Sequence, residues 1–289
     1  MFGVLVFAAA FFVAQSGSAM AAFTPLERWA RWGRVSLDVW ETALAVVLAT
    51  WATGRVVHGE DHDIWRRVGL DRSAWAARSV LLGLVVGALV LAVPVVLMVA
   101  TRQMRFESTT AIESPSVVVW SAIALMLPAA VWEELLMRGY VFSALRDGAG
   151  VNAAVIITSV GFGLAHITNP DPTLISLIAV TFAGIFLAFV RLVTGSLVAA
   201  IAAHLAFNLT QTVVLHAPVS GLALQTPGYR LVPVGPAWLT GGEWGPEGGI
   251  AVIVTLTLAS LLLLKRWAPM PAPTPAPPPT PDGTERTQP

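Results

Sequence analysis

The sequence contains no cysteine and little charge. Cysteine is absent from all 289 residues, which excludes disulfides, thiolate metal sites and a cysteine nucleophile. Charged residues make up 12% of the chain, about half the share typical of a soluble domain. The 17 basic and 17 acidic side chains balance without a basic block, so we expect no nucleic-acid partner. With 56% hydrophobic residues and a mean hydropathy of +0.73, the chain is predicted to be an integral membrane protein.

Long apolar segments predict an all-α fold, a polytopic transmembrane helical bundle of about eight spans. The clearest segment, Ser79–Ala100, carries no charge and is long enough to cross about 30 Å of hydrocarbon at 1.5 Å per residue. The amino-terminal segment Gly3–Ala14 is read as a retained span, because it lacks the positively charged start of a signal sequence. The other predicted spans are Val35–Thr53, Ser116–Arg138, Asn152–His166, Leu174–Val190, Ser196–Leu215 and Ile250–Leu264.

The chain divides into three predicted parts. Residues 1–34 form a hydrophobic segment and a basic interfacial helix, residues 35–266 a helical core, and residues 267–289 a disordered proline-rich tail. Within the core, the Gly- and Pro-rich stretch Ala217–Gly249 is predicted to be an extramembrane loop. The arginine distribution places both termini in the cytoplasm. Abundant arginine, alanine, glycine and proline favour a bacterial source, and hence the bacterial cytoplasmic membrane.

One predicted apolar span contains three charged side chains, those of Glu133, Glu134 and Arg138. Ionisable groups at membrane depth are costly and tend to persist only where they pair or have a task. Glu134 and Arg138 are four residues apart on a helix, which suits an ion pair. Glu133 is rotated by about 100° from Glu134 and cannot use the same geometry. We therefore predict one paired carboxylate, with a largely structural role, and one free carboxylate.

Two other predicted helices carry polar groups at the same spacing. Phe162 precedes His166 by four residues, and His204 precedes Asn208 by four. Because an unpartnered polar group in lipid costs several kcal/mol, we expect these faces and the glutamate pair to point at one another around a shared watery cavity.

This set of side chains allows hydrolysis. A carboxylate can activate a water as general base, an imidazole can share that water or protonate a leaving amine, and an imidazole with a carboxamide can donate to an oxyanion. A divalent metal such as zinc, held by Glu133, His166 and His204, would be an alternative way to activate the water. The sequence leaves both possibilities open.

Other conspicuous residues have simpler interpretations. His216 is read as a structural histidine, and Gly161, Gly163 and Gly184 as helix-packing positions. A metal site formed by His58, Asp61 and His62 is conceivable, but a solvated loop is the better interpretation because nothing holds those ligands at a fixed geometry.

At these residues the chain resembles the CPBP family of intramembrane metalloproteases, also called the CAAX prenyl protease and bacteriocin-processing (Abi-type) family. The family pattern is Glu-Glu-x-x-x-Arg, then Phe-x-x-x-His, then His-x-x-x-Asn or Asp, and all three motifs stand here in that order. The segments Thr194-Gly195-Ser196-Leu197 and Arg67-Val68-Gly69-Leu70 are also similar to the family, so the likeness covers roughly residues 55–208.

The resemblance implies an intramembrane endopeptidase. It implies that Glu133 activates the water with His166, that His204 and Asn208 stabilise the oxyanion, and that Glu134 and Arg138 orient the site. Metal-dependent and metal-free mechanisms have both been attached to the family. The implied partners are the lipid bilayer and a membrane-associated peptide or protein substrate. Rival interpretations are a transporter or permease, since ionisable residues in spans also mark ion paths, and a catalytically idle immunity or scaffold protein.

Overall fold

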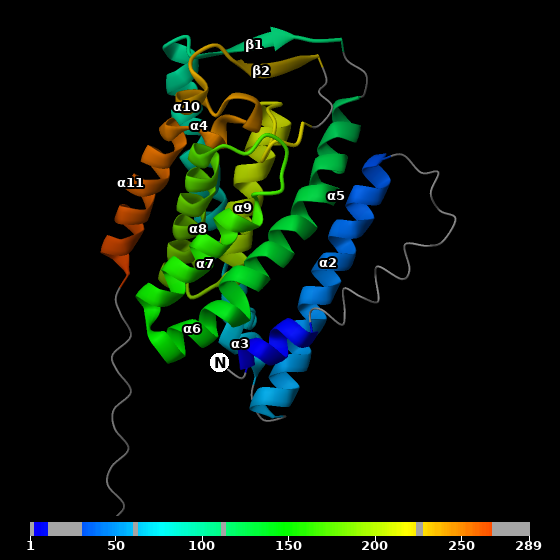
Figure 1. Cartoon of the computed structure of the whole chain (residues 1–289), viewed down its shortest axis with the longest axis vertical. Coiled ribbons are helices and arrows are strands. Elements are labelled where there is room, and N and C mark those ends of the chain that lie inside the picture. The colour runs from blue at the N-terminus through cyan, green and yellow to red at the C-terminus, as the bar shows by residue number, and fades with distance from the viewer. Residues whose placement is uncertain (1–2, 11–30, 60–62, 111–113, 224–227, 268–289) are drawn as a thin grey trace, which may run out of the picture.

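The structure is a bundle of helices with a two-stranded β-ribbon across one end (Figure 1). The computed structural model describes residues 3–10, 31–59, 63–110, 114–223 and 228–267. Residues 3–10 are helical. The later elements are α2 (Arg31–Thr53), η1 (Gly54–His58), α3 (Ile64–Val68), η2 (Arg72–Trp75), α4 (Ala77–Ala100), β1 (Met104–Ser108), α5 (Pro115–Glu134), η3 (Leu135–Tyr140), α6 (Val141–Ala149), α7 (Val151–Ala165), α8 (Leu174–Thr194), α9 (Leu197–Leu209), η4 (Thr210–Val214), β2 (Tyr229–Pro233), α10 (Ala237–Thr240), η5 (Gly242–Trp244), η6 (Pro246–Gly248) and α11 (Ile250–Arg266).

Four helices of the described residues are long and apolar enough to cross a membrane. They are α4, the continuous helix 115–149 formed by α5, η3 and α6, α8, and α9 together with η4. An all-α membrane bundle therefore fits, but the predicted count of about eight spans is not confirmed. Helices α7 and α11 have 15 and 17 residues. At 1.5 Å per residue these lengths are roughly 22 and 26 Å, short of a hydrocarbon core of about 30 Å.

The centre of the bundle is the contact between α4 and α9. A Cβ atom added to Gly83 would collide with the carbonyl oxygen of Ala199, and one added to Gly87 with that of Ala203. The two backbones can approach this closely only because both α4 positions lack a side chain. The largest hydrophobic core is built around this contact from α4, α8, α9 and α11.

Two of the three glycines predicted at helix contacts are confirmed. A side chain at Gly163 would meet Thr181, and one at Gly184 would meet Ser159. Gly161 has open space beside it, so its predicted packing role is wrong.

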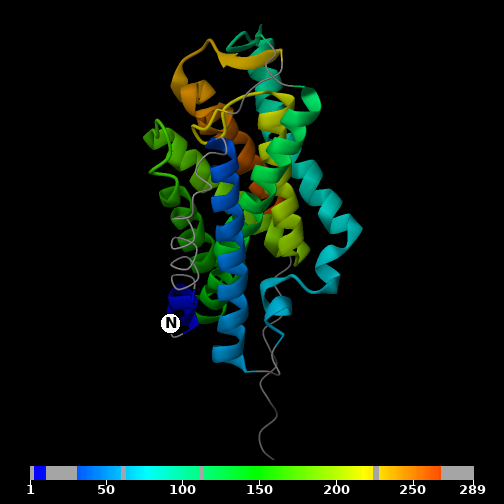
Figure 2. The ribbon, with the colours of Figure 1, turned by 90° about the vertical axis from the view of Figure 1, so that its right-hand side faces the viewer.

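Helix α2 runs along α5 for most of the height of the bundle (Figures 1 and 2). Pro128 of α5 has no N–H, so the carbonyl of Ala124 lacks its helical hydrogen bond. The indole Nε1 of Trp40 in α2 donates to that carbonyl at 3.1 Å. A backbone acceptor released by proline thus becomes a contact between two helices.

Helix α4 contains the same arrangement. Pro94 releases the carbonyl of Val90, and the hydroxyl of Thr255 in α11 donates to it at 2.8 Å. Both interior prolines of the long helices are therefore compensated by a side chain of a neighbouring helix.

Two short segments that resemble the family pack against each other. Gly195, at φ +66°, ends α8 in the left-handed conformation, and the hydroxyl of Ser196 then caps α9 by accepting from the N–H of Ala199 at 3.0 Å. Gly69, at φ +79°, ends α3 and accepts at its carbonyl from the N–H of Leu197 at 2.9 Å. This turn sets where α9, which carries His204 and Asn208, enters the bundle.

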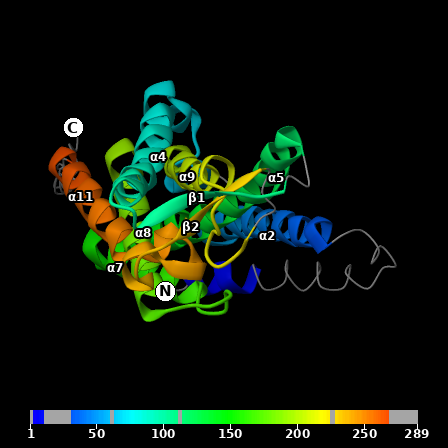
Figure 3. The ribbon, with the colours of Figure 1, turned by 90° about the horizontal axis from the view of Figure 1, so that it is seen from above.

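The stretch predicted as the loop Ala217–Gly249 contains structure that the sequence analysis missed. Strand β2 pairs antiparallel with β1, with Phe106 opposite Leu231, and the ribbon lies across the end of the bundle (Figure 3). Helix α10 and the short turns η5 and η6 then lead into α11. The stretch is therefore a folded cap, and the interpretation as a plain loop is wrong.

Several predictions fall outside the described residues. These are the last four residues of the proposed span Gly3–Ala14, part of the basic interfacial segment before Arg31, the loop residues Asp61 and His62, and the proline-rich tail beyond Trp267.

Candidate active site

Glu134 is the centre of the polar cluster inside the bundle. It is the last residue of α5, and its side chain is fully buried. Its Oε1 accepts from Nη1 of Arg138 at 2.9 Å and from Nδ1 of His204 at 3.0 Å. The predicted four-residue ion pair is thus confirmed. The same carboxylate also joins the first motif to the third.

Arg138 is held from three directions. Besides Glu134, its Nη2 donates to the carbonyl of Gly184 in α8 at 2.9 Å. Its guanidinium carbon lies 4.4 Å from the centroid of the Phe162 ring, a cation–π distance. A Cβ at Gly184 would lie 3.0 Å from Nη2 of Arg138, so glycine leaves room for the guanidinium. The buried cation is therefore fixed by α5, α7 and α8 together.

The two imidazoles are held in the same way, each through a hydrogen bond of its Nδ1. Nδ1 of His166 lies 2.8 Å from the carbonyl oxygen of Phe162. Because a carbonyl only accepts, this nitrogen carries the hydrogen. Nδ1 of His204 likewise donates to the carboxylate of Glu134. In a neutral ring Nε2 then holds the free lone pair. The ring of Phe162 packs edge-on against both imidazoles, with centroids 4.9 and 5.8 Å away.

Glu133 and Asn208 supply polar groups that make no side-chain hydrogen bond to another described residue. Oε2 of Glu133 is buried and has no hydrogen-bond partner among the described residues, and it lies 3.9 Å from Nε2 of His204. Asn208 lies one helical turn after His204 and is 6% exposed, and both residues line the same cavity. The structure therefore brings all six predicted residues (Glu133, Glu134, Arg138, His166, His204 and Asn208) around one site, with Glu133 and Asn208 turned to its free space.

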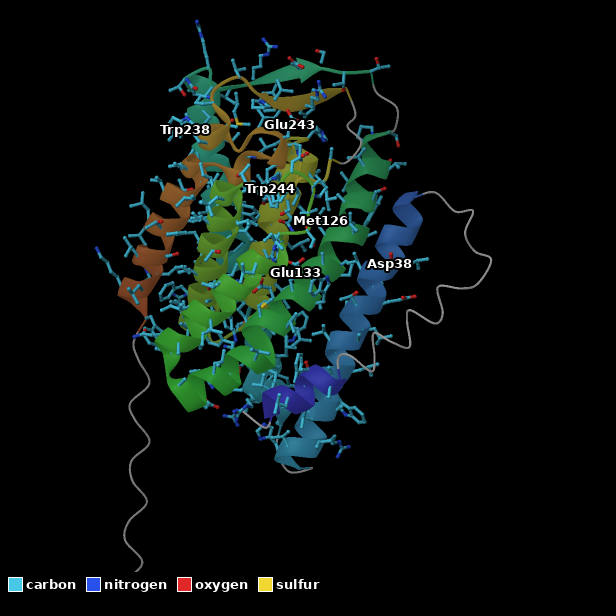
Figure 4. The ribbon with its side chains drawn as sticks, in the orientation of Figure 1. Asp38, Met126, Glu133, Trp238, Glu243 and Trp244 are labelled. Carbon is cyan, nitrogen blue, oxygen red and sulfur yellow. The ribbon has the colours of Figure 1, made fainter. Side chains whose placement is uncertain are left out.

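The free space is a cavity of about 240 Å³ with apolar walls. Its lining includes Met126, Phe186, Leu187 and Phe207. Figure 4 places Met126 and Glu133 in the middle of the bundle, below Trp244. A cavity somewhat smaller than most ligand sites, with a few convergent polar groups, suits a short stretch of an extended substrate.

Sequence reasoning missed three polar residues of this cavity, Asn169, Ser220 and Glu247. Glu247 lies in the stretch that was interpreted as a loop, where an acidic residue between glycines is unremarkable. No spacing rule links it to the motifs, because tertiary folding alone packs η6 on α8 and brings Glu247 to the cavity.

The donor types of the site fit a divalent metal. Metal-binding histidines usually donate one ring N–H to a carboxylate or carbonyl and bind through the other nitrogen. His166 and His204 are both arranged in this way, and Oε2 of Glu133 has no partner. Yet no group of three or more His, Cys, Asp or Glu side chains in the described ranges is close enough to hold a metal ion. Zinc binding by Glu133, His166 and His204 therefore stays a prediction.

Comparison with known proteins gives a family match over this site. Residues 115–210 match the family model described as Type II CAAX prenyl endopeptidase Rce1-like, which covers about a third of the chain. The matched segment contains all six residues of the polar cluster. No curated protein and no solved structure matches the chain. The resemblance to the CPBP and CAAX protease family, read from the three motifs, is confirmed by this match.

Proposed function

We propose that this chain, whose segment 115–210 matches the CAAX-type endopeptidase family, hydrolyses a peptide bond of a membrane-associated protein or peptide by water activated at Glu133. One observation carries the proposal. A carboxylate and a carboxamide that make no side-chain hydrogen bond to another described residue converge with two oriented imidazoles in one largely apolar cavity inside the bundle.

Glu133 acts as the general base. Its side chain lines the cavity, and its Oε2 lies 3.9 Å from Nε2 of His204, so a water held at this carboxylate has two acceptors close by. The carboxylate takes a proton from this water as the water oxygen attacks the peptide carbonyl carbon. A positioned base of this kind contributes about 100- to 10,000-fold to the rate.

The oxyanion that forms needs hydrogen-bond donors. The carboxamide of Asn208 donates in every protonation state of the site. His204 donates from Nε2 only as an imidazolium, because its Nδ1–H is already committed to Glu134. Each such donor is worth about 3–4 kcal/mol of barrier. Asn208 is therefore the donor that needs no proton rearrangement.

The remaining groups orient the site and move the proton. Glu134 and Arg138 fix the ring of His204, so their contribution acts through that ring. The proton taken by Glu133 must reach the amine as the carbon–nitrogen bond breaks, and Nε2 of His166 offers a second acceptor on that route. A divalent metal held by Glu133, His166 and His204 would supply Lewis-acid polarisation of the water.

The surroundings of the site suit a substrate that reaches it from lipid. The long apolar helices and the protease family support an integral membrane protein. The cavity walls are largely apolar, which fits an apolar segment of a membrane-associated peptide. The bacterial cytoplasmic membrane is the location that we propose from composition.

Cleavage of a quenched-peptide library by detergent-purified protein tests the proposal. We expect cleavage by the wild type, at least about a hundredfold less by Glu133→Gln, and unchanged cleavage by Glu107→Gln on the exposed ribbon. Loss of cleavage with a chelator, restored by zinc, would assign the metal. A wild type that cleaves nothing, or a fully active Glu133→Gln protein, would contradict the proposal and favour an immunity or scaffold role.

A further inference from the structure

A third carboxylate faces the cavity from outside the family-matched segment. Glu247 lies in η6, immediately before α11, and only 7% of the residue is exposed. It lines the same cavity as Glu133, His166 and His204. The mechanism above gives it no task, although burying a carboxyl group without one is costly.

The Glu247 side chain is held by Ser220, which lies in a segment that lines the cavity. Its Oε1 accepts from the backbone N–H of Ser220 at 2.5 Å and from the Ser220 hydroxyl at 2.8 Å. Ser220 has a φ of +49°, and its carbonyl accepts from the carboxamide of Asn169 at 3.1 Å. Three segments distant in sequence are thus tied together at the cavity. Both Ser220 donors go to one oxygen of Glu247, and the other oxygen makes no hydrogen bond to a described residue.

Two carboxylates, those of Glu133 and Glu247, line the cavity together with the imidazoles of His166 and His204, and none of its described lining residues is lysine or arginine. The nearby guanidinium of Arg138 is already paired with Glu134. Burial raises the pKa of Glu247, against the lowering effect of Ser220 and of the imidazoles of His166 and His204. Attraction between opposite charges is strong in a poorly solvated site. A bound cation would therefore offset the free-energy cost of burying the Glu247 carboxylate.

We propose that Glu247 is a specificity-determining residue that binds a cationic nitrogen of the peptide substrate beside the scissile bond. This inference rests on the proposed function, because that function is what makes the ligand a peptide. Two sources supply this nitrogen: the side chain of a lysine or arginine near the cleavage point, and the α-ammonium group of the amine product.

Binding measurements test this site without requiring turnover. Fluorescent apolar peptides that carry lysine at one position, or uncharged norleucine there, are titrated into detergent-purified protein in a Glu133→Gln background. We expect the lysine peptide to bind at least about tenfold more tightly, a difference of about 1.4 kcal/mol. Adding Glu247→Gln should bring the two affinities close together, because glutamine still accepts from Ser220 but carries no charge.

A matched control and a second ligand pair sharpen the test. Glu243→Gln makes the same chemical change one short turn away, at an exposed residue outside this cavity, and should keep the preference for lysine. Figure 4 shows Glu243 near the ribbon end of the bundle. Short peptides with a free or an acetylated amino terminus separate the sources: discrimination between them assigns the α-ammonium, and discrimination only between lysine and norleucine assigns the side chain.

The outcomes for the two proposals are distinct. Equal binding of the charged and uncharged members of both peptide pairs, or a preference that survives Glu247→Gln in a protein of unchanged melting temperature, would overturn the role of Glu247. A preference that depends on Glu247, in a protein whose wild type cleaves no peptide, would support the cation site and contradict the endopeptidase.

Discussion

The buried cluster around Glu134 and the charged ribbon at the end of the bundle use the same chemical groups in opposite surroundings. Glu134 and Arg138 are completely buried, and each makes a further hydrogen bond to another helix. On the ribbon, Glu107 pairs with Arg105 at 2.5 Å and Arg230 at 3.5 Å, and these side chains are between 32% and 66% exposed. The shorter contact is not the stronger constraint, because solvent screens the exposed charges, whereas removal of one member of the buried pair leaves an uncompensated buried charge.

The largest expected effect comes from breaking the buried pair. Arg138→Ala leaves Glu134 as an unpaired buried charge, which should cost about 3–5 kcal/mol of stability and also reduce cleavage. Unfolding in detergent and the yield of folded protein measure this loss. Arg105→Ala on the ribbon is the matched control and should lower stability far less, because solvent screens the exposed charges. Equal stability of the two variants would show that burial does not distinguish the pairs.

Asn208→Ala tests a cavity residue whose carboxamide makes no hydrogen bond to another described residue. We expect kcat for peptide cleavage to fall by about 100- to 1,000-fold, with little change in melting temperature, because the role that we propose for the carboxamide is donation to the oxyanion. Asn152→Ala, at an exposed position of α7, should leave both quantities unchanged. A large loss of stability in Asn208→Ala would place this residue with the structural cluster instead.

Thr255→Val tests the hydrogen bond that compensates for a helix proline. Loss of the hydroxyl strands the Val90 carbonyl and should cost about 1 kcal/mol. In a Pro94→Ala background the cost should shrink, because alanine restores the helical N–H donor. A double-mutant cycle measures this difference. If the stability changes of Thr255→Val and Pro94→Ala were additive, the hydroxyl of Thr255 would not compensate for Pro94.

The smallest effect is expected from the pH dependence of the ribbon. The guanidinium of Arg105 holds the pKa of the exposed Glu107 below its ordinary value, so folding is assisted above that ordinary value. This contribution is lost as the pH falls through the lowered pKa and Glu107 takes up a proton. The protection factors of the β1 amides, which compare the observed exchange rate with the intrinsic rate at the same pH, should therefore fall slightly in acid, and Arg105→Gln should reduce the change. Identical pH dependence in both proteins would exclude the pair as its cause.

The sequence predicted the polar cluster better than it predicted the β-ribbon, the position of Glu247 or the number of spans. The four-residue spacings of Glu134 with Arg138, Phe162 with His166 and His204 with Asn208 place each pair on one helix face. The cost of polar groups in lipid then brings those faces together, so helix-local periodicity was sufficient. The catalytic roles of these residues are not tested by the structure and stay proposals.

Residues that depend on distant partners could not be predicted in the same way. Strands β1 and β2 pair although most of the helical core lies between them in the sequence, and neither strand has a strong local pattern. Glu247 reaches the cavity only because η6 packs on α8. The count of about eight spans is not confirmed, since four helices of the described residues are long and apolar enough to cross a membrane and α7, predicted as a span, has 15 residues.

The indole of Trp40 and the ring of Pro128 have a consequence for the history of this chain. Any other residue at position 128 would supply the N–H that the Ala124 carbonyl lacks, and the donor on α2 would then be redundant. Loss of Trp40 alone would instead leave that carbonyl stranded. Substitution is thus permitted in one order and penalised in the other, so among descendants of a common ancestor the proline should disappear before the tryptophan does.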